Sequence, residues 1–296
     1  MAAEIQYDPQ GLQALNAALA FIVFSVALHL RLAQLRAVVR APRVVLVGLL
    51  AQWLALPAIT LVLILLVRPE PAFVAGMVLI AACPGGQVSN FYAMLAHGNA
   101  VLSVTLTSIS TLACALLTPL LFAVGLQVAG TSGGNLEVPL GDMLQLLAWT
   151  VLLPLTLGLA VQRWLPVAAA RLRAPSRLVA AVLLATIIAI GLFNNRGLLT
   201  DPTVLAMFWL VVVHNALAFV AGYAVARAFR TPEPEARAVT LETGIQNAGL
   251  GLILIFNFYP DQGGMMTLVA TWGVWHLLAG AVLARWWQRR TLPRPN

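Results

Sequence analysis

Charged residues are scarce in this 296-residue chain, and lysine is absent from it. Charged side chains make up 9% of the residues and hydrophobic ones 61%, and the mean hydropathy is +0.91. A soluble domain carries roughly 25% charged residues, so this composition excludes a water-soluble enzyme and a disordered chain. We predict an all-α polytopic membrane protein, because a helix satisfies its own backbone polar groups inside a bilayer.

Cysteine is nearly absent as well. Cys83 and Cys114 both lie inside apolar runs, and the sequence has no CxxC motif and no metal-type spacing to histidine. These features exclude a disulfide scaffold and argue against a zinc site. We expect both cysteines to be small buried hydrophobic residues.

Apolar runs of about 20 residues, the length needed to cross the hydrocarbon core, alternate with short clusters of Arg, Pro and Gly. They predict nine transmembrane helices. The predicted spans are 11–30, 44–67, 72–97, 99–128, 142–165, 177–194, 203–228, 235–258 and 264–287.

All 17 basic residues are arginine, and their distribution orients the chain. Fifteen of them follow odd-numbered spans, and only Arg68 and Arg196 follow even-numbered ones. The positive-inside rule therefore predicts an N-terminus outside and a C-terminus in the cytoplasm. The same placement indicates that the positive net charge reports orientation in a cell (inner) membrane and not binding to nucleic acid.

Two of the predicted spans contain residues that interrupt a helix. The third contains CPGGQVSN (83–90), and the eighth contains ETGIQNAGLG (242–251). Irregular backbone at membrane depth is tolerated only where protein or a water-filled cavity satisfies it. Because the breaks lie five spans apart, they run in opposite directions across the membrane. This is the pattern of an inverted five-helix repeat that lacks its first helix, an arrangement found in secondary transporters.

Glu242 is the most informative residue of the second break. A carboxylate at mid-membrane costs about 3 kcal/mol on insertion scales. A cation nearby would offset this cost, but the chain has no lysine and its arginines collect at the ends of spans. We therefore expect the partner of Glu242 to be a bound ion or a proton.

Oxygen-bearing side chains accompany Glu242. Ser103 and Thr107 are four residues apart, so they share one face of a helix that could look toward Ser89 and Asn90. Hydroxyl, amide, carbonyl and carboxylate oxygens are the ligands of hard cations. The alternative for any of these hydroxyls is a bond to its own helix at i−4, and the sequence leaves that choice open.

These residues carry a resemblance to a known family. The stretches CPGGQVSN (83–90), GNAVLSVTLTSISTLACALLTPLL (98–121) and ETGIQNAGLG (242–251) resemble the bile acid:sodium symporter family. The similarity extends to AQWLALP (51–57) and WHLLAGAVLA (275–284), so it covers nearly the whole chain. It implies a core domain with two crossing broken helices, a panel domain beside it, and alternating access between the two.

The resemblance also implies a division of the chain. The panel would take 1–43, which holds the first span and a cytoplasmic loop, and 142–194. The core would take 44–130 and 203–290, each with one break, and 291–296 would be a cytoplasmic tail.

Two sodium sites follow from the same resemblance. The first would consist of Ser89, Asn90, Ser103, Thr107 and Glu242. The second would consist of Gln52, Glu242, Gln246 and the backbone carbonyls of Thr243 and Ile245. The interpretation from the residues and the one from the family thus meet at Glu242.

The resemblance places the substrate beside the crossing, where half-helix N-termini near Gln87–Val88 and Asn247–Ala248 would point at an anion. Asn247 and His276 are the side-chain candidates there. Gln87 stands where relatives commonly have Thr or Asn. The resemblance therefore specifies the coupled ion but not the identity of the substrate. A bile acid-like or pantoate-like carboxylate is expected, and the Arg-only, Ala-rich composition favours a bacterial source and the smaller carboxylates. No protein partner is evident.

Three alternatives stay open at this point. One is a sodium-independent exporter of the same superfamily, and another is a channel-like or sensor protein on the same scaffold. The third is a membrane-embedded hydrolase that uses Glu242 with His214 or His276. Against the hydrolase, the chain has no HExxH motif, no GxSxG motif and no second acid in the membrane to complete a pair.

Overall fold

The computed structural model describes residues 9–28, 42–131, 137–194 and 202–290, and within these ranges every regular element is a helix apart from one isolated β-bridge. The predicted cytoplasmic loop after the first span, Arg196 and the tail 291–296 lie outside the described residues. The helices are α1 (Pro9–Ala27), α3 (Pro42–Leu50), η1 (Ala51–Ala55), α4 (Leu56–Val67), α5 (Pro71–Ala82), α6 (Val88–Leu95), α7 (Ala100–Val128), α8 (Leu140–Leu147), η2 (Ala148–Leu152), α9 (Leu153–Trp164), α10 (Pro166–Asn194), α11 (Pro202–Ala228), α12 (Glu233–Gly244), α13 (Ala248–Phe258) and α14 (Gly263–Gln288).

Five continuous helical segments in the described parts are long and apolar enough to cross a membrane. They coincide with the predicted second, fourth, fifth, seventh and ninth spans. Their bounds are Pro42–Val67, Ala100–Val128, Leu140–Trp164, Leu205–Ala228 and Gly263–Gln288. The chain is therefore an all-helical membrane protein with several spanning helices.

The predicted start of the sixth span differs from the structure. Helix α10 begins at Pro166 and not at Arg177, so Arg171 and Arg173 are helical rather than part of a loop. Hydropathy identifies only the apolar part of a helix. The helix itself can continue into water through alanine and arginine, which both have high helix propensity. A proline at the first helical position favours this early start.

Two short π-helical stretches interrupt long helices before a proline. In η1 the Leu56 N–H donates to the Ala51 carbonyl, and in η2 the Leu153 N–H donates to the Ala148 carbonyl. Pro57 and Pro154 follow, and proline has no N–H to donate, so the normal i→i−4 ladder cannot pass through these positions. The first stretch contains Gln52, one of the predicted site residues.

Both breaks occur where the sequence places them. The residues between α5 and α6 end the first half-helix at Ala82 and begin the second at Val88. The second break separates α12, which ends at Gly244, from α13, which begins at Ala248. Each break is covered by long neighbouring helices, with α5 and α6 against α7 and α14, and α12 against α11.

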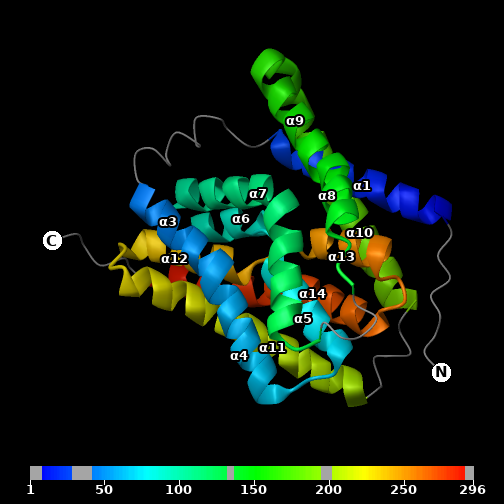
Figure 1. Ribbon diagram of the computed structural model, residues 1–296. Helices are drawn as coiled ribbons and strands as arrows, with labels where there is room; N and C mark the ends of the chain where they lie inside the picture. The colour runs from blue at the N-terminus through cyan, green and yellow to red at the C-terminus, as the bar shows by residue number, and fades with distance from the viewer. Residues whose placement is uncertain (1–8, 29–41, 132–136, 195–201, 291–296) are drawn as a thin grey trace.

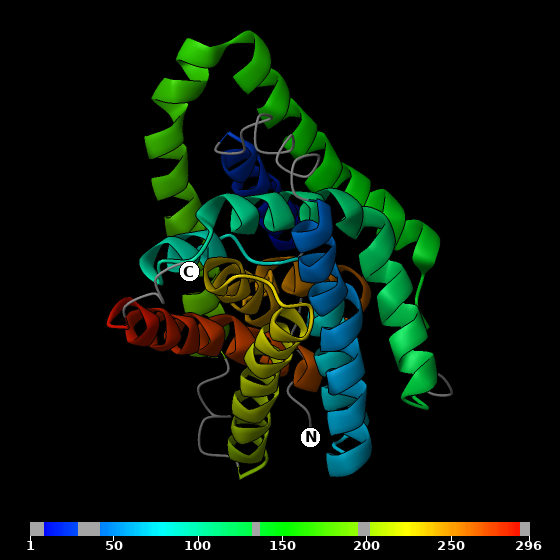
Figure 2. The same ribbon diagram turned by 90° about the vertical axis from the view of Figure 1, so that its left-hand side faces the viewer.

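The helices α1, α9 and α10 pack mainly on one another. In Figure 2 the green helices α8 to α10 and the dark-blue α1 lie on one side of the molecule, and α11 to α14 lie on the other. In Figure 1, α9 rises clear of the remaining helices. A pair of side-chain hydrogen bonds of 2.9 and 3.0 Å between Asn16 and Asn257 joins α1 to α13.

Candidate functional site at the crossing of two broken helices

The two breaks cross and bond to each other through their backbones. The Gly86 N–H donates to the Ile245 carbonyl (2.7 Å), and the Asn247 N–H donates to the Pro84 carbonyl (2.8 Å). Gly85 and Gln246 form the isolated antiparallel bridge. Backbone groups that the breaks remove from the helices are thus satisfied by the opposite break, as a buried backbone requires.

Glycine at 85 and 86 permits this close approach. A Cβ atom at 85 would overlap the Glu242 carboxylate, and one at 86 would lie 2.9 Å from the Gln246 carbonyl oxygen. The two glycines therefore bring the first break against the side chain and the backbone of the second.

Five predicted side chains converge on one side of the crossing, and we call them the first cage: Ser89, Asn90, Ser103, Thr107 and Glu242. The Glu242 carboxylate accepts hydrogen bonds from Ser89 Oγ (2.6 Å), Ser103 Oγ (3.2 Å) and Thr107 Oγ1 (2.7 Å). The Asn90 amide oxygen lies 2.9 Å from Ser103 Oγ and 3.1 Å from Thr107 Oγ1. Three different helices, α6, α7 and α12, supply these groups.

The first cage holds more acceptor oxygens than hydrogens to fill them. The Thr107 hydroxyl has one hydrogen but lies within 3.1 Å of three acceptors, which belong to Asn90, Ser103 and Glu242. Ser103 likewise has one hydrogen and two nearby acceptors, on Asn90 and Glu242. The i−4 bond of Thr107 to the Ser103 carbonyl is present as well, so the two interpretations of this hydroxyl are not exclusive. Lone pairs in such excess fit a cation.

Among the described residues, no positively charged side chain forms an ion pair with Glu242, which is 1% exposed. The two ion pairs found among the described residues both involve Glu233, which pairs with Arg227 and Arg237. Arg237 is buried on the same helix, but its guanidinium is held by Glu233 and by the Ala96 carbonyl (2.8 Å). A carboxylate in this setting calls for a bound cation or a proton.

The second cage consists of Gln52, Glu242, Gln246 and the Thr243 and Ile245 carbonyls. The Gln52 amide nitrogen lies 3.4 Å from the Gln246 side-chain oxygen, and the Gln246 amide nitrogen donates to the Thr243 carbonyl (2.7 Å). The Ile245 carbonyl already accepts from Gly86 and retains one lone pair. The Gln52 amide oxygen is buried and has no hydrogen-bond partner among the described residues.

The buried Gln52 oxygen without a partner among the described residues fits a ligand of a cation. Buried polar atoms otherwise find partners in nearly every case. In the described parts of the chain, no three His, Cys, Asp or Glu side chains gather into a group that could hold a metal ion. The oxygens of both cages thus fit an alkali cation, whereas zinc and the transition metals favour nitrogen and sulfur ligands.

The substrate candidates lie at the starts of the second half-helices. The Asn247 side-chain oxygen caps α13 by accepting from the Leu250 N–H (3.1 Å), which leaves its amide nitrogen as a donor. Helix α6 has no side-chain cap at Gln87, and Val88 is exposed. Two of the first N–H groups of α6 are nevertheless occupied by backbone carbonyls, because Ser89 donates to Gly86 (2.9 Å) and Asn90 donates to Gln87 (3.2 Å).

His276 faces the second break. It shares one side of α14 with Gly273 and Gly280, three and four residues away. A Cβ at Gly273 would contact Ala248, and one at Gly280 would lie 2.9 Å from Ile245. The buried His276 Nδ1 has no partner among the described residues.

Two side chains that the sequence did not single out as site residues hold the ends of the broken helices. Thr118 Oγ1 on α7 donates to the Ala82 carbonyl (2.9 Å), the last of α5. The Asn215 amide on α11 donates to the Gly244 carbonyl (2.7 Å), the last of α12. Both are polar residues within apolar spans, and Thr118 also lies in the stretch 98–121 that resembles the family, but neither signal indicates a bond to the end of another helix.

His214 bridges two helices. Its Nε2 lies 2.7 Å from Thr60 Oγ1, and Thr60 donates its single hydrogen to the Leu56 carbonyl (2.8 Å). The His214 Nδ1 is buried and has no hydrogen-bond partner among the described residues. This bonding engages His214 with Thr60 rather than with Glu242.

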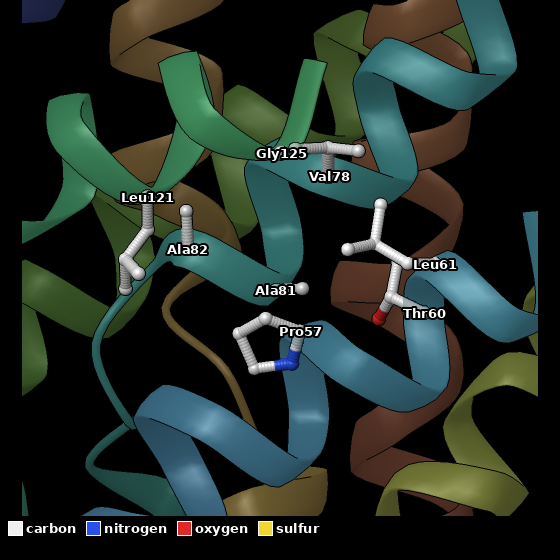
Figure 3. A pocket seen from close by; sticks show the side chains of 8 residues that line it. All are labelled: Pro57, Thr60, Leu61, Val78, Ala81, Ala82, Leu121 and Gly125. Carbon is white, nitrogen blue, oxygen red and sulfur yellow. The ribbon is translucent and has the colours of Figure 1, made fainter. Parts of the chain in front are cut away.

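A small cavity lies beside Thr60. Figure 3 shows side chains of α4, α5 and α7 around it, and its volume is about 20 Å³. This is space for about one water molecule, and the lining is apolar apart from the Thr60 hydroxyl. The cavity is too small for a carboxylate substrate and contains none of the predicted site residues. Its lining residues are Pro57, Thr60, Leu61, Val78, Ala81, Ala82, Leu121 and Gly125.

Comparisons with known proteins agree on one family. A sequence profile described as "Sodium Bile acid symporter family" matches residues 16–202. The chain is 30% identical over 273 residues to an "Uncharacterized sodium-dependent transporter YocS" of Bacillus subtilis (strain 168), and the match covers 92% of this chain and 82% of the relative.

Plant proteins are also similar. The chain is 27% identical over 282 residues to a "Probable sodium/metabolite cotransporter BASS2, chloroplastic" of rice (Oryza sativa subsp. japonica), with 93% of this chain and 64% of that protein covered. It is 28% identical over 280 residues to a BASS1 protein of the same description from Arabidopsis thaliana, with 93% and 67% covered. The chain thus spans about two thirds of the length of these plant relatives.

Proposed function

The chain belongs to the sodium bile acid symporter family, and from that premise we propose that it is a sodium-coupled symporter of a small organic anion. The family and the relatives named above are transporters, so the chain is a transporter and not an enzyme. The observation that carries the proposal is the buried Glu242 carboxylate, which has three hydroxyl donors and, among the described residues, no ion pair with a basic side chain.

We assign two sodium ions to the crossing, one to each cage. Glu242 is common to both cages, so the two ions bind to the same carboxylate from different sides. The excess of lone pairs around Thr107 supports the first ion, and the unpartnered Gln52 oxygen supports the second.

We assign the panel domain to 1–43 and 142–194, and the core domain to 44–130 and 203–290. The mutual packing of α1, α9 and α10 supports a panel that moves as a unit. In this proposal the chain has nine spans with its N-terminus outside, in a cell (inner) membrane. Alternating access is the movement of the core against the panel around the crossing.

Coupling follows from electrostatics at the crossing. Sodium bound in both cages neutralises Glu242 and leaves a net positive charge, and it fixes the positions of Gln246 and Gln52. An anion then becomes favourable at the starts of α6 and α13, where helix N-termini carry partial positive charge. Because coupling free energies are reciprocal, the substrate increases the affinity for sodium by the same factor as sodium increases the affinity for substrate.

The substrate class is a small carboxylate, such as a pantoate-like molecule. We assign its carboxylate to the uncapped start of α6 near Gln87 and Val88, and its polar groups to the Asn247 amide and His276. The exposed Val88 and the free donor of Asn247 support this assignment.

The test is uptake into proteoliposomes with an inward sodium gradient. The proposal expects accumulation of one of a panel of labelled carboxylates, no accumulation with potassium in place of sodium, and substrate-dependent entry of sodium. Equal accumulation of substrate with and without the sodium gradient would instead favour the sodium-independent exporter. Sodium entry without any substrate would favour a channel-like protein.

A further inference from the structure

The turn between α9 and α10 combines positive charge with exposed apolar side chains. Four arginines, 163, 171, 173 and 177, lie within or beside it, and the sequence contains no acid between Asp142 and Asp201. In both overall views this turn projects beyond the other helices (Figures 1 and 2). The local charge is therefore uncompensated by any neighbour along the chain.

One of these arginines has a structural partner. Arg173 Nε donates to the Leu28 carbonyl (2.9 Å), which also accepts from the Gln162 amide (2.9 Å). Arg163, Arg171 and Arg177 are exposed, and the ion pairs of the described residues involve other arginines. These three guanidinium groups are available to an external anion.

A shallow surface hollow of about 590 Å³ lies at the same turn. Arg171 lines it together with apolar side chains that include Trp164, Leu165, Val167 and Leu172. Trp164 is 76% exposed, and exposed tryptophan beside arginine is typical of the membrane interface. The first turn of α10 also begins here; Pro166 has no N–H and Ala169 donates to the Leu165 carbonyl (2.9 Å), so Val167 and Ala168 supply the N–H groups that lack an acceptor within the helix.

We propose that this hollow binds the headgroup of an anionic phospholipid. The phosphodiester would lie between the Arg171 guanidinium and the start of α10, where arginine and a helix N-terminus both favour phosphate. The glycerol and the first carbons of the acyl chains would lie on Leu165, Val167 and Leu172. A soluble anion would use the charge but not this apolar lining, and an acidic protein segment would not place acyl chains on it.

The test compares lipids with identical acyl chains on the purified full-length protein. Native mass spectrometry would count phosphatidylglycerol and phosphatidylcholine molecules retained by the wild type, by Arg171→Gln and by Arg290→Gln. Arg290 is the matched control, because its guanidinium already stacks on Trp286, 3.8 Å from the ring centre. Arg171 is exposed, so its substitution leaves the fold intact.

We expect the wild type to retain phosphatidylglycerol in preference to phosphatidylcholine. Arg171→Gln should lose about fivefold in affinity for phosphatidylglycerol, the effect of one basic residue at an anionic surface, and Arg290→Gln should lose none. Equal retention of both lipids, or no difference between the two variants, would overturn the proposal. Full displacement of phosphatidylglycerol by millimolar inorganic phosphate would do the same, because it would indicate a site for the free anion.

Discussion

The two cages at the crossing share Glu242 but consist of different chemical groups. The first is made of side chains from three helices, with hydroxyls that converge on a carboxylate at 2.6 to 3.2 Å. The second is made of two side-chain amides and of backbone carbonyls at a break, and its Gln52 oxygen has no partner among the described residues. In the first cage the hydroxyls bond to the carboxylate but acceptors outnumber hydrogens, whereas the second cage leaves the Gln52 oxygen without a partner among the described residues.

This difference shows that the first cage depends mainly on sequence and the second mainly on the fold. The first cage depends on residue type, because each hydroxyl and carboxylate is specified by one side chain. The second depends on the break itself, because its carbonyls are free only where α12 ends at Gly244. Substitutions should therefore damage the first cage directly and the second mainly through Gln52 and Gln246.

Removing the shared carboxylate is the largest change and should disable both cages together. We expect Glu242→Ala to reduce sodium-driven uptake to background while the protein still inserts in the membrane, because both ions lose their only charged ligand. Glu235→Gln is the matched control, since Glu235 lies on the first turn of the same helix and accepts from Asn99. Proteoliposome uptake measures both variants, and full sodium-dependent transport by Glu242→Ala would contradict the account.

Thr107→Val keeps the shape of the side chain but removes one oxygen of the first cage. We expect the sodium concentration for half-maximal uptake to rise about tenfold, because a bond to a charged group contributes about 1.5 to 3 kcal/mol. Thr107→Ser retains the hydroxyl and should stay close to the wild type. If both substitutions had the same effect, the hydroxyl would not be a ligand.

Gln52→Ala affects the second cage alone. We expect a rise of roughly fivefold in the half-saturating sodium concentration, since a neutral ligand contributes about 1 kcal/mol. The dependence of uptake on sodium should also become less steep, because one of two ions is lost. Gln127→Ala, at an exposed glutamine of α7, serves as the control. An unchanged steepness in Gln52→Ala would argue against a second ion in this cage.

Gln87→Thr should have the smallest effect on sodium, because Gln87 lies in neither cage. We expect the relative affinities among a panel of carboxylates to shift by about tenfold, as is typical when a pocket changes by one or two heavy atoms. Competition for uptake of the best substrate measures this shift. Equal loss of affinity for every anion, or a weaker sodium response, would show that Gln87 does not select the substrate.

Much of this architecture could be predicted from the sequence because a small number of strict physical constraints determine how a chain crosses a bilayer. Runs of apolar residues predicted the five long spans, and Pro84 with its two glycines predicted the first break. The four-residue spacing of Ser103 and Thr107 predicted that they share one face, and both lie within hydrogen-bond distance of Asn90.

Other features could not be predicted because they depend on contacts between distant segments. Asn215 and Thr118 hold the ends of broken helices through single hydrogen bonds across 29 and 36 residues of chain. Nothing local to either residue distinguishes it from a polar residue that bonds to its own helix. The early start of α10 was missed for a different reason, since hydropathy detects the membrane-spanning part of a helix and not its extension into water.

The central claim is that Glu242 is the shared ligand of sodium at the crossing, and a sodium titration of the purified protein tests it most directly. Thermal stability would be measured in sodium and in potassium at matched ionic strength, without and with small carboxylates, for the wild type and Glu242→Ala. We expect sodium alone to raise the thermal stability of the wild type and a substrate to raise it further only in sodium. Both effects should vanish in Glu242→Ala. Equal stabilisation by the two salts, or a sodium response that survives in Glu242→Ala, would contradict the claim.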